Sequence, residues 1–188
     1  MKVILASASP RRSQLLTEAG VEFDVIPSDV DEVVDKTLSP RSLAESLARQ
    51  KAECVYKKTG GVVLGADTIV VLGNEVLGKP RDEADAIATL ARLSGMRHEV
   101  ITGFCVIYGG KRAKIINRSV VTGVVFNNLS ASLIESYVAS GKPMDKAGSY
   151  GIQSGGGKFV EKIEGDYDTV VGLSLTITKQ LIDEAIND

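Results

Sequence analysis

Four apolar runs rich in Val and Ile alternate with segments of helical spacing, and this order restricts the chain to an α/β fold. The apolar runs cover residues 2–6, 62–72, 99–108 and 113–126, and helical spacing is found over 10–19, 39–57, 81–93, 130–139 and 169–187. Gly109-Gly110 lies between two long strands and is a hairpin signal, so we expect a mixed sheet rather than a purely parallel one. Gly73-Asn74 predicts a second, shorter hairpin.

One glycine-rich loop and one ambiguous helix stand out along the chain. The loop from 140 to 158 holds six of the 19 glycines, which predicts a segment that is mobile or lies close to a ligand. Gly172 falls inside the last helical pattern and obscures where that helix begins. We find no repeat, low-complexity tract or linker, so 188 residues are expected to form one domain with room for two lobes.

Charge and composition exclude several classes of protein. A net charge of −2 argues against a general electrostatic grip on a nucleic acid polymer, but a local cationic site for a small polyanion is compatible with it. No apolar run approaches the roughly 20 residues of a membrane helix, so we expect a cytoplasmic protein without a membrane anchor. Cys54 and Cys105 lack zinc or disulfide spacing and are predicted to be core thiols.

The end of the first strand has the composition of an anion site. Ser9 suits the N-cap of a helix and Pro10 its first position, so free backbone amides and the helix dipole would favour a phosphate there. The hydroxyls of Ser7 and Ser9 and the guanidiniums of Arg11 and Arg12 could hold its oxygens. The alternative is an ordinary capped surface helix with solvated arginines.

Two lysines are candidate phosphate ligands. Lys51 falls on the apolar stripe of the helix at 39–57 by the three-and-four spacing rule, so it faces inward. Its ammonium either reaches water along the stem or receives a phosphate in a cleft wall. Lys79 follows Gly78 and precedes Pro80, where it is either a phosphate ligand or a plain turn lysine.

Acidic residues supply candidates for catalysis and metal binding. Asp67 interrupts a strongly apolar run, where an ionised carboxylate requires a cation or several donors, although a structural Asp bonded to backbone amides is an alternative. Asp24, Asp29, Asp31 and Glu32 accompany a short strand around 23–26, and most such clusters are solvated loops. If this cluster meets Asp67, two carboxylates could share a divalent cation at a nucleotide's phosphates.

The single histidine and the absence of several known motifs restrict the possible reaction mechanisms. His98 is the only histidine and lies in a polar setting, and no nucleophile elbow, Walker-type phosphate loop or dinucleotide fingerprint is present. Carboxylate bases with dispersed Lys and Arg side chains fit best with metal-assisted attack of water at phosphorus.

Six motifs occur together in one order along nearly the whole chain. They are Ala6-Ser7-Ala8-Ser9-Pro10-Arg11-Arg12, Asp31-Glu32, Lys51-Ala52, Gly65-Ala66-Asp67-Thr68, Gly78-Lys79-Pro80 and Asp145-Lys146-Ala147-Gly148-Ser149-Tyr150-Gly151-Ile152-Gln153. In this set the chain resembles the Maf family of nucleoside triphosphate pyrophosphatases, which release pyrophosphate and leave a nucleoside monophosphate. The resemblance implies a single domain over 1–188 with an elongated mixed α/β sheet flanked by helices, two lobes and a central cleft, as in inosine triphosphate pyrophosphatases.

The resemblance also implies roles for the candidate residues. Asp67 matches the family's catalytic carboxylate, either as proton acceptor or mainly as ligand of metal and orienter of water, and Glu32 would help to hold Mg²⁺ or Mn²⁺. Lys51 and Lys79 match its phosphate-facing lysines.

Further matches concern substrate binding. Ser7, Ser9 and Arg12 belong to the phosphate-binding loop of the family, whereas Arg11, Thr68 and Gln153 match positions associated with substrate preference. These roles imply a small nucleoside triphosphate as substrate, and the family also suggests a homodimer.

The segment ending in Gln153 resembles the subgroup active on dTTP and UTP. A glutamine amide can pair with the N3–H and a carbonyl of thymine or uracil. Alternatives are inosine-like or methylated guanosine triphosphates as substrates, or a nucleotide-binding regulator of cell division. The chain departs from the family pattern at Asp168-Thr169 and at Ser174, which could alter base contacts or the closing helix.

Overall fold

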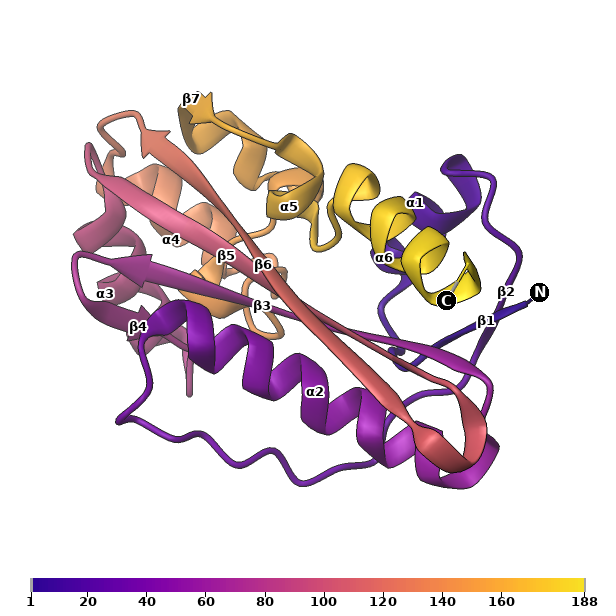
Figure 1. The fold of residues 1–188 in the computed structure, drawn as a ribbon. Coiled ribbons are helices and arrows are strands. Elements are labelled where there is room, and N and C mark those ends of the chain that lie inside the picture. Colours follow the sequence, from indigo (N-terminus) through magenta and orange to yellow (C-terminus); the bar gives the residue numbers. More distant parts are fainter. Residues whose placement is uncertain (1, 188) are drawn as a thin grey trace. The chain divides into compact units, whose positions relative to one another are not determined.

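The computed structural model describes residues 2–187, which form two compact units (Figure 1). Unit 1 contains the chain up to Asp67, then Thr102–Val120 and the residues from Gly172 onward. Unit 2 contains Thr68–Ile101 and Val121–Val171. The chain passes between the units four times, three times within a long strand and once at Val171–Gly172, outside any strand.

The strands of the described residues form one mixed sheet. They are β1 (Val3–Leu5), β2 (Phe23–Val25), β3 (Val62–Leu72), β4 (Glu75–Leu77), β5 (Arg97–Tyr108), β6 (Lys114–Phe126) and β7 (Val160–Glu164). Their order is β2-β1-β3-β5-β6-β7, with β4 beside β3. β1 pairs in parallel with β2 and β3, whereas the pairs β3–β4 and β6–β7 are antiparallel. The predicted mixed sheet and the hairpin at Gly73-Asn74 are thus confirmed.

Helices flank this sheet and begin close to the predicted residues. They are α1 (Pro10–Glu18), α2 (Pro40–Thr59), α3 (Glu83–Leu93), α4 (Ala131–Val138), α5 (Tyr167–Val171) and α6 (Leu175–Asn187). The hydroxyl of Ser39 accepts the Ser42 N–H at 3.3 Å and so caps α2, which ends where Gly60 adopts φ 63°. The predicted α/β class with helices flanking a mixed sheet is confirmed.

Two expectations about the C-terminal third are wrong. The single helix predicted over 169–187 is two helices, because the chain breaks at Gly172, which adopts φ 129°. The strand β7 was not predicted, since its sequence Val-Glu-Lys-Ile-Glu is mostly polar. It is the last strand in the order and pairs only with β6, so it is an edge strand. Charged side chains are common on edge strands.

In unit 1, α2 packs directly on the strand backbone. A Cβ atom on Gly65 of β3 would lie 2.3 Å from the carbonyl oxygen of Ala48, and one on Gly103 of β5 would lie 2.2 Å from the backbone of Ala44. The helix stripe that includes Ala48, Ala52 and Val55 is completely buried against these strands. The two glycines therefore set how closely α2, and with it Lys51, approaches β3.

Substitution of Gly65 by Ala should destabilise the protein strongly. The added Cβ meets backbone atoms of α2, which cannot move aside as a flexible side chain would, and we expect a loss of about 1–3 kcal/mol in the free energy of unfolding. Urea denaturation measures this loss. The matched control is Gly78→Ala, where no atom lies within 4 Å of the added group and a change under about 1 kcal/mol is expected. Equal stability of both variants would contradict the close packing.

Unit 2 has its own core, which contains a cluster of aromatic rings. Phe126 stacks edge to face with Tyr150 and Phe159, at centroid distances of 4.8 and 5.8 Å. His98 belongs to this cluster and is 1% exposed, so the expected polar setting is wrong: the ring is enclosed by residues distant in the sequence. The loop 140–158 is folded into three short 3₁₀ helices, η2 (Ala147–Ser149), η3 (Ile152–Ser154) and η4 (Gly156–Phe159).

The two cysteines differ in their surroundings. Cys105 is buried, as predicted, and burial raises the pKa of its thiol to about 12. Cys54 is only half-buried, and its Sγ lies 2.9 Å from Oδ1 of Asp29, so it is not a core thiol. It is directed instead at the irregular segment that carries Asp29.

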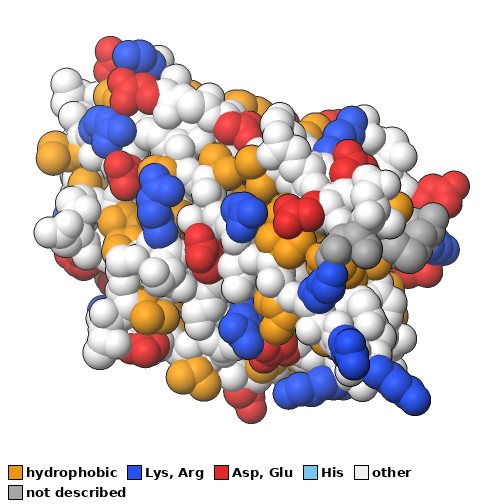
Figure 2. Space-filling view, viewed as in Figure 1, with side chains coloured by type: hydrophobic (Ala, Val, Ile, Leu, Met, Phe, Trp, Pro, Cys, Tyr) orange, Lys and Arg blue, Asp and Glu red, His pale blue; other side chains and the backbone are white. Residues whose placement is uncertain are grey.

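Surface charge is mixed and no membrane span is found. Lys and Arg side chains are interspersed with Asp and Glu on the face shown in Figure 2, in keeping with the net charge of −2. Within residues 2–187, every helix is too short or too polar to cross a membrane.

Candidate functional site

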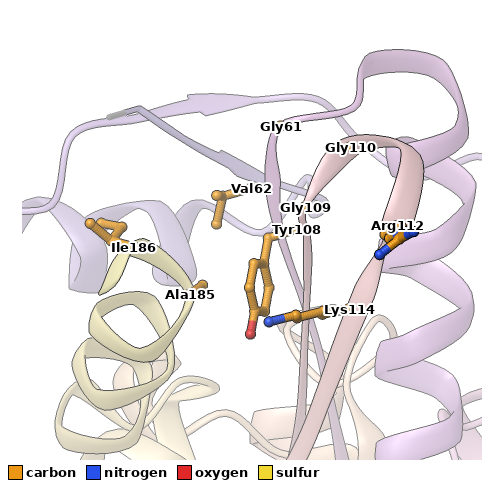
Figure 3. A pocket seen from close by; sticks show the side chains of 9 residues that line it. All are labelled: Gly61, Val62, Tyr108, Gly109, Gly110, Arg112, Lys114, Ala185 and Ile186. Atoms are coloured by element: carbon orange, nitrogen blue, oxygen red, sulfur yellow. The ribbon is translucent and has the colours of Figure 1, made fainter. Parts of the chain in front are cut away.

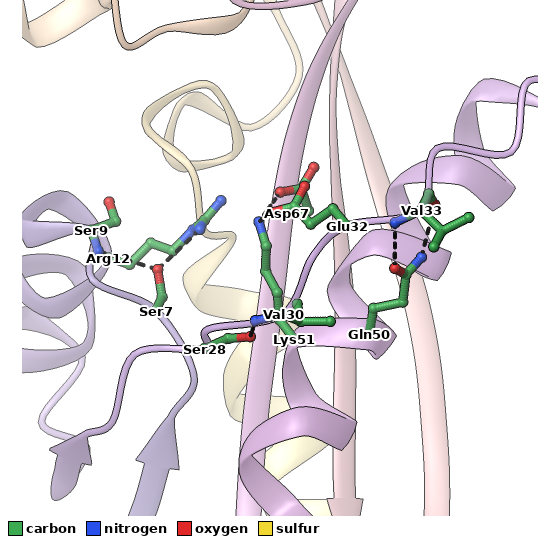
Figure 4. A network of polar contacts seen from close by, with 10 residues as sticks. All are labelled: Ser7, Ser9, Arg12, Ser28, Val30, Glu32, Val33, Gln50, Lys51 and Asp67. Atoms are coloured by element: carbon green, nitrogen blue, oxygen red, sulfur yellow. Dashed lines mark hydrogen bonds and ion pairs between the residues drawn. The ribbon is translucent and has the colours of Figure 1, made fainter.

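Three charged side chains of unit 1 converge at the middle of β3 (Figure 4). The ammonium of Lys51, on α2, forms an ion pair with Oδ1 of Asp67 and lies 3.1 Å from Oε1 of Glu32. The side chains of Lys51 and Asp67 are 16% and 13% exposed, and Glu32 is 40% exposed, so a ligand can still reach the group. Of the acidic cluster, Glu32 therefore shares the Lys51 ammonium with Asp67.

A glutamine that the sequence did not single out holds Glu32 in place. The side-chain amide of Gln50 accepts the N–H of Val33 at 2.8 Å and donates to the Val33 carbonyl at 3.0 Å. Val33 follows Glu32, and Gln50 precedes Lys51, so consecutive residues of α2 position both ends of the ion pair. No sequence signal marks Gln50, because the segment that it anchors has no regular structure.

The other acidic residues of this cluster, Asp24, Asp29 and Asp31, do not form an ion pair with Lys51 among the described residues. Asp29 pairs with Lys58 at 2.7 Å, and this bond, together with that from Cys54, lowers the pKa of Asp29 to about 2. Asp24 pairs with Lys2 at 2.6 Å, and Asp31 is exposed. Only one of the four acidic residues therefore reaches the Lys51–Asp67 pair.

Arg12, in the predicted anion site after the first strand, is buried and held by hydrogen bonds. Its Nε donates to the carbonyl of Gly172 at 2.9 Å and its Nη1 to the hydroxyl of Ser7 at 3.1 Å, and the side chain is buried. Burial lowers the pKa of Arg12 from its ordinary value, and the charge of Asp67 opposes this shift. Figure 4 shows it directed toward the Lys51–Asp67 pair.

Ser9 and Arg11, which lie close to Arg12 in the sequence, are placed differently from Arg12. Ser9 is at the N-cap position of α1 in extended conformation, but its side chain makes no capping bond. Its N–H donates instead to the Ser7 hydroxyl at 3.2 Å. Arg11 is half-buried, unlike Arg12. The solvated-arginine alternative is therefore wrong for Arg12.

The remaining predicted site residues belong to unit 2. Thr68 follows Asp67 directly on β3, and Lys79 and Gln153 are exposed. The N–H of Gly148 donates to the carbonyl of Gly78 at 3.1 Å, so the turn before Lys79 is bonded to the segment that leads to Gln153. Unit 2 thus joins two of the motifs that lie far apart in the sequence.

The carboxylates of unit 1 suit a divalent cation. Glu32 and Asp67 already converge on one positive charge, the Lys51 ammonium, and carboxylate oxygens are the preferred ligands of Mg²⁺ and Mn²⁺. Among residues 2–187, no three His, Cys, Asp or Glu side chains cluster in a way that could hold a metal. Such an ion would therefore take its other ligands from water and substrate phosphates, as Mg²⁺ commonly does.

A hollow of about 610 Å³ lies elsewhere in unit 1 (Figure 3). Its lining consists of Gly61, Val62, Tyr108, Gly109, Gly110, Arg112, Lys114, Ala185 and Ile186. It contains no carboxylate and none of the predicted site residues. The hollow is therefore separate from the Lys51–Asp67 pair.

Comparison with solved structures defines the class of fold. The chain is similar to a HAM1 protein from Coxiella burnetii, with a TM-score of 0.55 and 17% identity over 98% of this chain and 100% of that chain. It is also similar to the Staphylococcus aureus Ham1 protein, with a TM-score of 0.51 and 14% identity over 98% and 99% of the two chains. The fold is therefore of the Ham1 type.

Sequence comparison is more specific. The family described as Maf-like protein matches residues 2–185, and the chain belongs to the Maf family. It is 51% identical to the dTTP/UTP pyrophosphatase of Geotalea uraniireducens (strain Rf4), over 92% of this chain and 89% of that protein. The dTTP/UTP pyrophosphatase of Aquifex aeolicus (strain VF5) is 46% identical, over 98% of this chain and 95% of that protein.

Proposed function

We propose that this protein is a nucleoside triphosphate pyrophosphatase that hydrolyses dTTP and UTP to the monophosphate and pyrophosphate. The observation that carries the proposal is the Lys51–Asp67–Glu32 group, because it combines two carboxylates and a lysine ammonium in a partly exposed position. Membership of the Maf family and about 50% identity to dTTP/UTP pyrophosphatases support the substrate assignment.

The residues of unit 1 act on the phosphates. Arg12 is fixed by Ser7 and Gly172 and offers a preorganised positive charge, which stabilises negative charge developing on the triphosphate. Lys51 exchanges its carboxylate partners for phosphate oxygens when the nucleotide binds. Lys79, exposed in unit 2, adds a further positive charge, and Ser9 belongs to the same phosphate-binding loop as Ser7 and Arg12.

Asp67 has a mixed role in this proposal. With Glu32 it would hold Mg²⁺ or Mn²⁺, which when bound supplies charge stabilisation to the phosphates and lowers the pKa of water. Asp67 orients the attacking water toward the α-phosphorus and accepts its proton. The new bond joins the water oxygen to the α-phosphorus, and the bridging oxygen leaves with pyrophosphate.

Base selection is assigned chiefly to Gln153 of unit 2. The Gln153 amide can accept the N3–H of thymine or uracil and donate to an adjacent carbonyl, and Thr68 and Arg11 contribute to the same preference. A panel of dTTP, UTP, CTP, ITP and methylated GTP, each with Mg²⁺ and with Mn²⁺, tests this assignment through pyrophosphate release. We expect the highest kcat/KM for dTTP and UTP, whereas a clear purine preference would overturn it.

Arg11 and Arg12 should respond differently to substitution by Ala. We expect Arg12→Ala to lower kcat/KM for all nucleotides by about a hundredfold, because it removes a preorganised charge from the phosphates. Arg11→Ala should instead change the ratio of kcat/KM between nucleotides by about tenfold. The same panel measures both, with thermal melting as the check of folding. An equal loss for every nucleotide in Arg11→Ala would contradict the division of roles.

The proposal also includes the location and the oligomeric state of the enzyme. It acts in the cytoplasm on free nucleotides, as a homodimer in which each chain is one Maf-like domain spanning 1–188. Light scattering coupled to size-exclusion chromatography gives the mass in solution. A mass of one chain at enzyme concentrations that retain full activity would exclude the dimer as the required form.

A further inference from the structure

His98 forms a buried polar pair with Tyr150 in unit 2. Nε2 of His98 lies 2.8 Å from the Tyr150 hydroxyl, and the two residues are 1% and 6% exposed. The imidazole is nearly perpendicular to the rings of Tyr150 and Phe126, at centroid distances of 5.5 and 4.8 Å. Burial lowers the pKa of His98 to about 4 and raises that of Tyr150, so both groups are neutral near pH 7.

Tyr150 is continuous with the segment that carries Gln153. The next residue, Gly151, donates its N–H to the hydroxyl of Tyr137 at 3.1 Å, and its carbonyl accepts the N–H of Ser154 at 3.0 Å. A Cβ atom on Gly151 would lie 2.3 Å from Oγ of Ser154, so the turn is tightly closed around Gln153. The backbone on both sides of Gln153 is thereby fixed by hydrogen bonds.

The backbone just before Tyr150 is itself unusual. Ser149 is buried and adopts φ 60°, and it is the only residue other than glycine with a positive φ between residues 2 and 187. A side chain in the left-handed region persists where the surroundings enforce it. The His98–Tyr150 bond is one such constraint, because it pins the side chain of the following residue to β5.

We propose that His98 is a positioning residue for base recognition: through Tyr150 it fixes the backbone that presents Gln153 to the nucleotide. The inference rests on the proposed function, since it assigns the base contact to Gln153. Packing alone does not require this pair. Two phenylalanines would fill the same apolar cluster without enclosing any polar group, whereas Nε2 of the imidazole and the Tyr150 hydroxyl satisfy each other and add a directional restraint.

The test compares His98→Phe, Tyr150→Phe and the double variant with wild type, through KM, kcat and thermal melting. Each single variant leaves one buried polar group unpaired and should melt at lower temperature, with KM for dTTP and UTP raised about tenfold and kcat within about twofold. The double variant leaves neither group unpaired, so its melting temperature should recover while KM stays high. A merely structural role predicts that KM recovers together with stability.

Two further variants sharpen the result. Tyr137→Phe removes the acceptor of the Gly151 N–H and should raise KM in the same way. The matched control is Tyr56→Phe, which loses a hydroxyl that donates to the Gly110 carbonyl at 3.1 Å in unit 1 and should keep wild-type constants.

The outcomes separate the two proposals. A wild-type protein that releases no pyrophosphate overturns the proposed function. An active wild type whose double variant has normal KM overturns the role of His98 alone. The double variant keeps the test decisive if a single variant fails to fold, because it buries no unpaired polar group.

Discussion

Replacement of Asp67 by Asn is expected to lower kcat for dTTP and UTP by about a hundredfold to ten-thousandfold. The amide has the same shape but carries no charge, so it neither accepts a proton from water nor binds a cation with comparable strength. The Lys51 ammonium also loses its closest partner. Steady-state release of pyrophosphate from both nucleotides measures the effect, and circular dichroism confirms that the variant is folded.

The control for this substitution is Asp29→Asn. Asp29 also holds a lysine, Lys58, but it lies outside the Lys51–Asp67–Glu32 group, so turnover should stay at the wild-type rate. A folded Asp67→Asn protein with undiminished turnover would remove Asp67 from the reaction. An equal loss in both variants would mean that the effect is a general one of lost surface charge.

Substitution of Lys51 by Met should have two opposite effects. Activity falls, with kcat/KM for both nucleotides lowered by about a hundredfold, because a positive charge at the phosphates is lost. Binding of Mn²⁺ without nucleotide becomes about tenfold tighter, because the ammonium no longer neutralises Asp67 and Glu32. Met keeps most of the aliphatic stem of Lys51. Isothermal titration calorimetry with Mn²⁺ alone measures the second effect independently of activity.

Lys58→Met is the matched control for Lys51→Met, since it removes an exposed lysine of the same helix that pairs with a different carboxylate. Its Mn²⁺ affinity and turnover should equal those of wild type. Unchanged Mn²⁺ affinity in Lys51→Met would show that the ammonium does not compete with a cation at the two carboxylates. Unchanged kcat/KM would remove Lys51 from phosphate binding.

Regular elements were predictable where side-chain periodicity alone determines them. The run 62–72 coincides with β3, since ten apolar or small residues and one carboxylate fit a strand buried on both faces. The inward orientation of Lys51 also followed from spacing, because residues three and four positions apart share a helix face. The structure adds that its ammonium meets the carboxylates of Asp67 and Glu32.

Other features depended on contacts between residues distant in the sequence. His98 is buried because Tyr150, 52 positions later, supplies its partner. Glu32 is fixed by Gln50 through the backbone of Val33, in a segment without helix or strand. The different burial of Arg11 and Arg12 depends on Gly172, 160 positions after Arg12. Local pattern cannot reveal such pairs.

The most direct test of the central claim follows the oxygen of water into the products. dTTP is hydrolysed in H₂¹⁸O, and mass spectrometry then locates the label. Attack of water at the α-phosphorus predicts one ¹⁸O atom in dTMP and none in pyrophosphate. Label in pyrophosphate, or release of orthophosphate with dTDP, would contradict the account.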